Sequence, residues 1–182
     1  MRVSRKEIKD REVIRGLLSK SPVGRLGTLG RDGYPRIKPL NFVSLEEKIY
    51  FHSAREGEKM EDIQRDNRVC FEVDLPLAFV KSTGNPCQAD YLYQSVLIKG
   101  RAQIVDARDE RLAALKGLME KYQPEGDYGA FSEDKLALTA IVRIDIEEMT
   151  GKEDLGREKE RAAVLAFLAR KERAADRLTL ER

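Results

Sequence analysis

Residues 23–43 read VGRLGTLGRDGYPRIKPLNFV, and this stretch decides the fold. Two segments of strand-like composition, residues 23–29 and 34–43, flank the tetrapeptide Gly30-Arg31-Asp32-Gly33. Asp-Gly is a strong hairpin signal because both residues tolerate a positive φ angle. The stretch therefore predicts a β-hairpin, which is the basic unit of an antiparallel sheet.

The sequence after this hairpin predicts more strands, with helices inserted between some of them. A turn at residues 45–48 leads into KIYFHSA at 48–54, and VCFEVD at 69–74 is rich in β-branched and aromatic residues. A long strand is expected at 91–106, where Gly100 indicates a bulge or sharp bend of the kind that turns a barrel corner. The remaining expectations are a short helix at 57–66, an irregular connection at 75–90, a helix at 109–122 and a final strand at 139–151.

Both ends of the chain are expected to be helical. Ser4 followed by Glu7 matches a capping box, and the helix that follows should stop at Ser21-Pro22. Its apolar face consists of Ile14, Leu17 and Leu18. A charged helix is expected at 154–178.

These elements predict a mainly β (α+β) fold: a six- to seven-stranded antiparallel barrel with flanking helices. Closing the sheet into a barrel removes exposed strand edges, which makes it the economical architecture. A chain of 182 residues suits one hydrophobic core, so we expect a single domain at 1–182 with its barrel core at about 22–152.

Composition and charge exclude several classes of protein. The chain has 34 Lys and Arg against 32 Asp and Glu, a net charge of +2, and both signs are interspersed. Nucleic acid is therefore not an expected partner. The N-terminus lacks the apolar core of a signal peptide, and no run approaches the ~20 apolar residues of a membrane span, so a cytoplasmic protein without a membrane partner is expected.

The sequence offers no set of metal ligands. Its two cysteines, Cys70 and Cys87, form no CxxC pair and lie far from the single histidine, so no metal site is expected. Cys70 lies within the apolar segment VCFEV and is expected to pack in the core.

The region around His52 has the groups that a phosphate needs. Within eight residues it offers an imidazole, the Ser53 hydroxyl, the backbone N–H groups of a helix start after Gly57, and the Lys59 ammonium. A phosphate monoester carries about −1.5 to −2 charges and several acceptor oxygens. The structural alternative is that His52 ends a strand and Lys59 is solvated surface, and spacing alone favours that alternative.

Several short motifs, taken in order, resemble one family. They are VGRLGTLGRDGYPRIKPLNFV, IYFHSAREGEKMEDI, NRVCFEV, CQADYLYQSVLIKGRA and EEMTGK, running from about Val23 to Lys152. Together they resemble the pyridoxamine 5′-phosphate oxidase-like, flavin-binding split-barrel family, in the branch of the nitroimidazole-resistance reductases. The resemblance implies a split β-barrel that binds FMN in a cleft between the two subunits of a homodimer.

The same resemblance assigns cofactor-binding residues motif by motif. The HSA-x-x-G-x-K segment, assigned to the phosphate, supplies His52, Ser53, Ala54, Gly57 and Lys59. The strand assigned to the isoalloxazine, through its backbone and an asparagine side chain, supplies Lys38, Pro39, Leu40, Asn41 and Phe42. The Y-x-S-V segment, expected from the partner chain, supplies Tyr93, Ser95 and Val96.

The resemblance also implies an activity. It predicts an FMN-dependent oxidoreductase that takes hydride from NADH or NADPH and reduces a small acceptor such as a nitroimidazole or nitroaromatic compound. His52 is a candidate proton donor or phosphate ligand, and FAD is an alternative to FMN. Where relatives carry a tryptophan two residues after the cysteine, this chain has Ala89, and it lacks the arginine-rich substrate motif of true pyridoxamine phosphate oxidases.

Two other functions are compatible with the sequence. A non-catalytic flavin-binding carrier or redox sensor would share all the binding motifs. An unrelated small-barrel interaction domain would bind no cofactor, and the grouping of His52, Ser53 and Lys59 argues against it.

Overall fold

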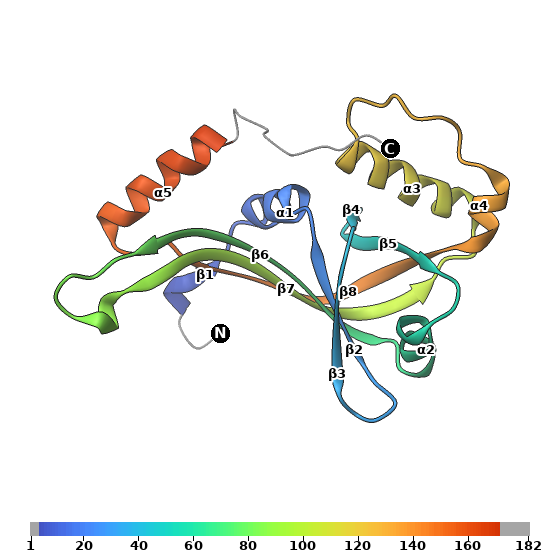
Figure 1. The fold of residues 1–182 in the computed structure, drawn as a ribbon, viewed down its shortest axis with the longest axis horizontal. Helices are drawn as coiled ribbons and strands as arrows, with labels where there is room; N and C mark the ends of the chain where they lie inside the picture. Colours follow the sequence, from blue (N-terminus) through green and yellow to red (C-terminus); the bar gives the residue numbers. More distant parts are fainter. Residues whose placement is uncertain (1–3, 172–182) are drawn as a thin grey trace.

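Antiparallel pairing organises the structure, a computed structural model that describes residues 4–171. One sheet curls into a half-barrel in the order β3-β2-β6-β7-β8-β5-β4, with β1 paired to β8 (Figure 1). Its strands are β1 (Glu7–Ile8), β2 (Gly24–Leu29), β3 (Pro35–Leu40), β4 (Val43–Leu45), β5 (Lys48–Ala54), β6 (Arg68–Val80), β7 (Asp90–Ile104) and β8 (Thr139–Asp154). The predicted class, an antiparallel split barrel with flanking helices, is confirmed.

The predicted hairpin at 30–33 forms, and the predicted turn at 45–48 closes a second hairpin. In the β2–β3 hairpin Leu29 pairs with Pro35, and Gly33 adopts a φ of 82° in the turn. In the β4–β5 hairpin Glu46 and Glu47 carry the turn with φ angles of 49° and 59°. Two consecutive positive φ angles match the right-handed twist of the flanking strands.

The long strand β7 bends at Gly100, as the sequence predicts. Its pairing with β8 shifts register between Lys99 and Gly100. A Cβ atom on Gly100 would lie 2.3 Å from the backbone oxygen of Asp145, so only glycine allows this close approach.

Strand β6 is longer than predicted, and the expected irregular connection at 75–90 is wrong for its first six residues. β6 continues to Val80 through a bulge between Pro76 and Ala78. Its pairing with β2 covers only Cys70 to Glu72, so beyond that point β6 is an edge strand on this side. Proline is tolerated on an edge because its missing N–H breaks no ladder hydrogen bond.

Helices close the open sides of the half-barrel. They are α1 (Arg11–Lys20), α2 (Glu58–Arg65), α3 (Arg108–Tyr122), α4 (Glu133–Leu138) and α5 (Glu158–Lys171), with short 3₁₀ turns at Ser4–Lys6 and Pro86–Gln88. The main core lies between the sheet, α1 and α2, while α3 covers β4, β5 and β8. A third cluster joins α5 to the two-stranded arm formed by the ends of β6 and β7.

Three expectations near the chain ends and in β6 need correction. The capping box at Ser4 is wrong, because α1 starts at Arg11 with Asp10 as its N-cap, accepting from the Glu12 N–H at 2.8 Å. α4 was not predicted, and the C-terminal helix begins at Glu158; the part expected beyond Lys171 lies outside the described residues. Cys70 is exposed, since strand alternation turns it away from the core that its neighbours Val69 and Phe71 enter.

Candidate functional site

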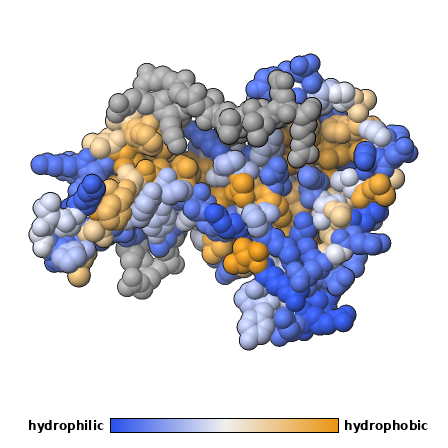
Figure 2. All heavy atoms as spheres, viewed as in Figure 1, coloured by the Kyte–Doolittle hydropathy of each residue, from blue (hydrophilic) through white to orange (hydrophobic). Residues whose placement is uncertain are grey.

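Two cationic side chains of strand β3, Arg36 and Lys38, lie near the start of α2. Lys38 lies opposite the buried Leu26, and Arg36 lies opposite Thr28, whose hydroxyl donates to Asp62 of α2 at 2.9 Å. Successive side chains of a strand alternate between its faces, so Arg36 and Lys38 share the face that meets α2. The face of this hairpin seen in Figure 2 is mainly hydrophilic, although the hairpin also exposes Tyr34 and Ile37.

One carboxylate, Glu58 in the first turn of α2, contacts both cations. Its Oε2 atom lies 2.7 Å from Lys38 Nζ, and its Oε1 atom forms an ion pair with Arg36. The contact with Lys38, supported by Arg36, holds the pKa of Glu58 below its ordinary value. The sequence motifs did not identify Arg36 or Glu58 as part of the site.

A third cation near the start of α2 is Lys59, which, unlike Arg36 and Lys38, lacks a carboxylate partner among residues 4–171. Its Nζ atom lies 5.3 Å from the centroid of the buried Phe51 ring. Burial, and then the positive charge of Lys38, lower the pKa of Lys59. Two neighbouring ammonium groups repel each other, and an anion bound between them would relieve this repulsion.

The end of β5 separates Ser53 from His52. Ser53 lies on the same face of β5 as Phe51 and Ile49, whose side chains enter the main core on the side of Lys59. His52 lies on the opposite face with Tyr50, whose side chain packs under α3. Although the imidazole is exposed, the surrounding protein and then Lys59 lower the pKa of His52. The lowered pKa favours the neutral imidazole, so His52 is not expected to add a further cation to Lys38 and Lys59.

The loop between β5 and α2 supplies backbone donors. Gly57 is the N-cap of α2 and adopts a φ of 114°, a region that glycine enters without steric cost. Its carbonyl accepts from the Met60 and Glu61 N–H groups. The N–H groups of the two residues before Met60 precede the helical ladder, as the first N–H groups of any helix do.

The break between β3 and β4 is held by Tyr122, at the end of α3. Its hydroxyl accepts from the Phe42 N–H at 3.0 Å and lies 2.9 Å from the Pro22 carbonyl and 3.1 Å from that of Phe42. The Phe42 side chain is fully buried and packs edge-on against Phe71. Of the two predicted ring contacts at this break, Asn41 is exposed and Phe42 is buried.

Removing the Tyr122 hydroxyl should weaken this connection. We expect Tyr122→Phe to lower the free energy of unfolding by about 1–2 kcal/mol, because the buried Phe42 N–H loses its partner. Urea unfolding measures the change, and Tyr128→Phe, at a half-exposed position, is the matched control. Equal stability of both variants would show that the hydroxyl does not stabilise the break.

The predicted residues of β7 lie far from the β3–β5–α2 group. Tyr93 and Ser95 face outward, and Lys152 Nζ lies 5.4 Å from the Tyr93 ring centroid. Ser95 pairs with Lys152 on β8, whereas His52 pairs with Ile141, eleven positions away on the same strand. That separation is on the order of 35 Å of extended strand, and Figure 1 shows α2 and the start of β7 toward opposite ends of the molecule. Val96 is fully buried in the main core, so its side chain cannot contact a ligand.

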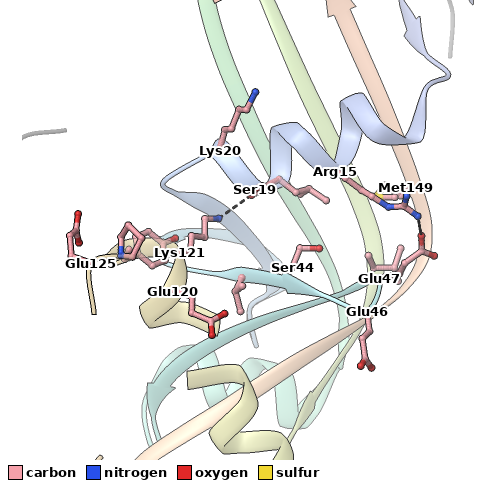
Figure 3. Close-up of a pocket in the computed structure, with 15 residues that line it drawn as sticks. Arg15, Ser19, Lys20, Ser44, Glu46, Glu47, Glu120, Lys121, Glu125 and Met149 are labelled. Carbon is pink, nitrogen blue, oxygen red and sulfur yellow. Dashed lines mark hydrogen bonds and ion pairs between the residues drawn. The ribbon is translucent and has the colours of Figure 1, made fainter. Parts of the chain in front are cut away.

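The structure also contains a cavity that the sequence motifs did not reveal. It has a volume of about 910 Å³ and lies between α1, β4, the end of α3 and β8 (Figure 3). None of the predicted cofactor-binding residues lines it. Its lining comes from four elements distant in sequence, so no local motif could have signalled it.

Two further observations concern the part of the chain that is described. Residues 4–171 contain no group of three or more His, Cys, Asp or Glu side chains placed to hold a metal ion. Within the same residues, no helix combines the length and the apolar character needed to cross a membrane.

Comparison with known proteins identifies both a matching family and similar structures. A family model described as pyridoxamine 5′-phosphate oxidase matches residues 10–153. No curated protein matches the sequence.

Three of the similar structures come from Bacteroides, Azotobacter and Mycobacterium species. A suspected 5-nitroimidazole antibiotic resistance protein from Bacteroides thetaiotaomicron has a TM-score of 0.72 at 24% identity, over 81% of this chain and 86% of its own. The flavocytochrome from Azotobacter vinelandii has a TM-score of 0.76 at 18% identity, over 89% and 77%. The FAD and heme binding protein from Mycobacterium smegmatis has a TM-score of 0.75 at 18% identity, over 87% and 80%. At these identities the likeness establishes a shared fold.

Proposed function

Because the chain belongs to the pyridoxamine 5′-phosphate oxidase family, we propose that it binds FMN where β3, β5 and α2 meet. The observation that carries this proposal is the ammonium of Lys59, which has no carboxylate partner within residues 4–171. Together with Lys38, the Ser53 hydroxyl and the first N–H groups of α2, it forms a donor set that suits a phosphate monoester. FAD is the alternative ligand, supported by the FAD and heme binding protein that shares the fold.

The proposed site needs a second copy of the chain. Tyr93 and Ser95 lie too far along the sheet from Lys59 to reach the same flavin within one chain. We therefore propose a homodimer in which these two side chains close the partner's site.

The activity we propose is reduction of a small acceptor, such as a nitroaromatic compound, at the expense of NADH or NADPH. When bound, FMN supplies the hydride chemistry. The residues of this chain bind and orient it: Lys38 and Lys59 hold the phosphate, and Asn41 lies along the ring. His52 lies on the other face of β5 from the phosphate group, so it could donate a proton to an acceptor on the α3 side of β5 only after taking up a proton itself, which its lowered pKa disfavours.

Spectroscopy of the purified protein tests the proposal. We expect visible flavin absorbance after incubation with FMN, quenching of FMN fluorescence on titration, and a dimer by size-exclusion chromatography with light scattering. FAD and riboflavin are titrated in parallel to identify the ligand. A protein that stays colourless and leaves the fluorescence of all three flavins unchanged would refute flavin binding.

Anaerobic addition of NADH or NADPH then separates an enzyme from a carrier. Bleaching of the bound flavin, followed by reoxidation on adding a nitroaromatic acceptor, is expected for a reductase. Bound flavin that neither nucleotide reduces would instead identify a non-catalytic flavin carrier or redox sensor.

A further inference from the structure

Glu58 occupies the position between β3 and α2 where an anionic ligand would be expected to bind. Its two carboxylate oxygens contact different cations, Arg36 through Oε1 and Lys38 through Oε2. The Lys38 Nζ atom is buried from solvent, and Glu58 meets it as an ion pair at 2.7 Å without completing a hydrogen bond, so a ligand oxygen could improve on this contact. A carboxylate of this chain therefore makes the contacts that a phosphate oxygen would make.

The other acidic groups nearby do not take this role. Asp32 lies 3.6 Å from Arg36 but makes no contact with Lys38. Asp62 is buried one turn further along α2, where Thr28 and Arg65 donate to its carboxylate. Glu58 is thus the single carboxylate among residues 4–171 that contacts both β3 cations.

We propose that Glu58 is a specificity-determining residue, whose carboxylate competes with the ligand's phosphate for Lys38 and Arg36. This inference rests on the proposed flavin site. A ligand must carry enough negative charge to displace the carboxylate from both cations, so a terminal phosphate monoester displaces it and an uncharged ribityl chain does not.

The position of Glu58 allows its carboxylate to leave Arg36 and Lys38 at a small cost in free energy. Its side chain is 52% exposed and sits in the first turn of α2, so it can rotate into solvent without disturbing the core. The Arg36 and Lys38 side chains are only 28% and 30% exposed, so the phosphate must replace the contacts that the carboxylate leaves. A phosphate carries about −1.5 to −2 charges and forms several charge-assisted hydrogen bonds, so it outcompetes a single carboxylate.

The test compares Glu58→Gln with Glu61→Gln. Both substitutions remove one negative charge from α2, but Glu61 is exposed and contacts neither β3 cation. The probes are FMN and riboflavin, followed by fluorescence, and inorganic phosphate, followed by ³¹P NMR.

Competition predicts a specific pattern of affinities. Glu58→Gln should bind FMN and inorganic phosphate about fivefold more tightly than the unmodified protein. Riboflavin, which has no phosphate, should bind equally well to both. Glu61→Gln should change each affinity less than about twofold. If Glu58 instead held the cations in place, Glu58→Gln would bind FMN and phosphate more weakly or equally, and the inference would be wrong.

The measurement with inorganic phosphate tests this inference separately from the proposed flavin binding. If the protein binds no flavin but phosphate binds more tightly to Glu58→Gln, flavin binding fails and the competition stands. If FMN binds but neither ligand responds to Glu58→Gln, flavin binding stands and the competition fails. If no flavin binds and phosphate affinity is unchanged, both fail.

Discussion

Replacing Lys59 with alanine is expected to weaken FMN binding by about 1.5–3 kcal/mol, a factor of about 10 to 150 in Kd. The ammonium has no carboxylate partner within residues 4–171, and Lys38 adds a like charge nearby. A phosphate between the two would gain a charge-assisted hydrogen bond from Lys59 that alanine cannot supply. Fluorescence titration with FMN measures the loss.

Two controls separate this effect from a general one. Lys116→Ala removes the same charge from an exposed position on α3 and should leave the Kd unchanged. Riboflavin binding should respond much less to Lys59→Ala than FMN binding does, because riboflavin has no phosphate. An FMN affinity equal to that of the unmodified protein would remove Lys59 from the site.

Truncation of Phe71 is expected to have the largest effect on stability. Phe71→Ala should lower the free energy of unfolding by about 3–5 kcal/mol, because the ring is fully buried and its loss leaves a cavity. The ring packs edge-on against Phe42 with centroids 4.9 Å apart. It also fills the space above Gly24, where an added Cβ atom would lie 2.0 Å from Phe71 Cζ. Urea unfolding provides the measurement.

The same strand provides the matched control. Phe79 lies eight residues further along β6 and is 57% exposed, with the Tyr91 ring 6.1 Å away. Phe79→Ala should cost no more than about 1 kcal/mol, the upper range for a cross-strand aromatic pair. Comparable losses for the two variants would contradict the assignment of Phe71 to the main core and Phe79 to the surface.

Part of the proposed phosphate site could be predicted from the sequence, because some of its residues are neighbours along the chain. Ser53, Gly57 and Lys59 fall within one strand end and one helix start, and the structure keeps them together. Lys38 lies 21 positions before Lys59, and only the family resemblance placed it at the site. Glu58 went unrecognised because its role depends on contacts with β3.

Other site residues show where sequence patterns stop being informative. Alternation along β5 gives Ser53 and His52 opposite faces, but which face meets Lys59 depends on how α2 packs. Val96 belongs to the same motif as Tyr93 and Ser95, yet it is buried because β7 turns that face toward the main core. The Y-x-S-V motif indicated the right segment of β7, but the packing of the sheet determines which of its side chains are accessible.

The sequence by itself determined the hairpin at 30–33, the turn at 45–48, the bend at Gly100 and the apolar face of α1. These features arise from interactions between residues close in the chain, namely the φ preferences of turn residues and the periodicity of side chains. Only the tertiary structure decided that β6 continues past Pro76, that Glu58 bridges two cations, and that Tyr93 lies far from Lys59. Those outcomes depend on which strands pair and in what register, and pairing brings together residues that no local pattern connects.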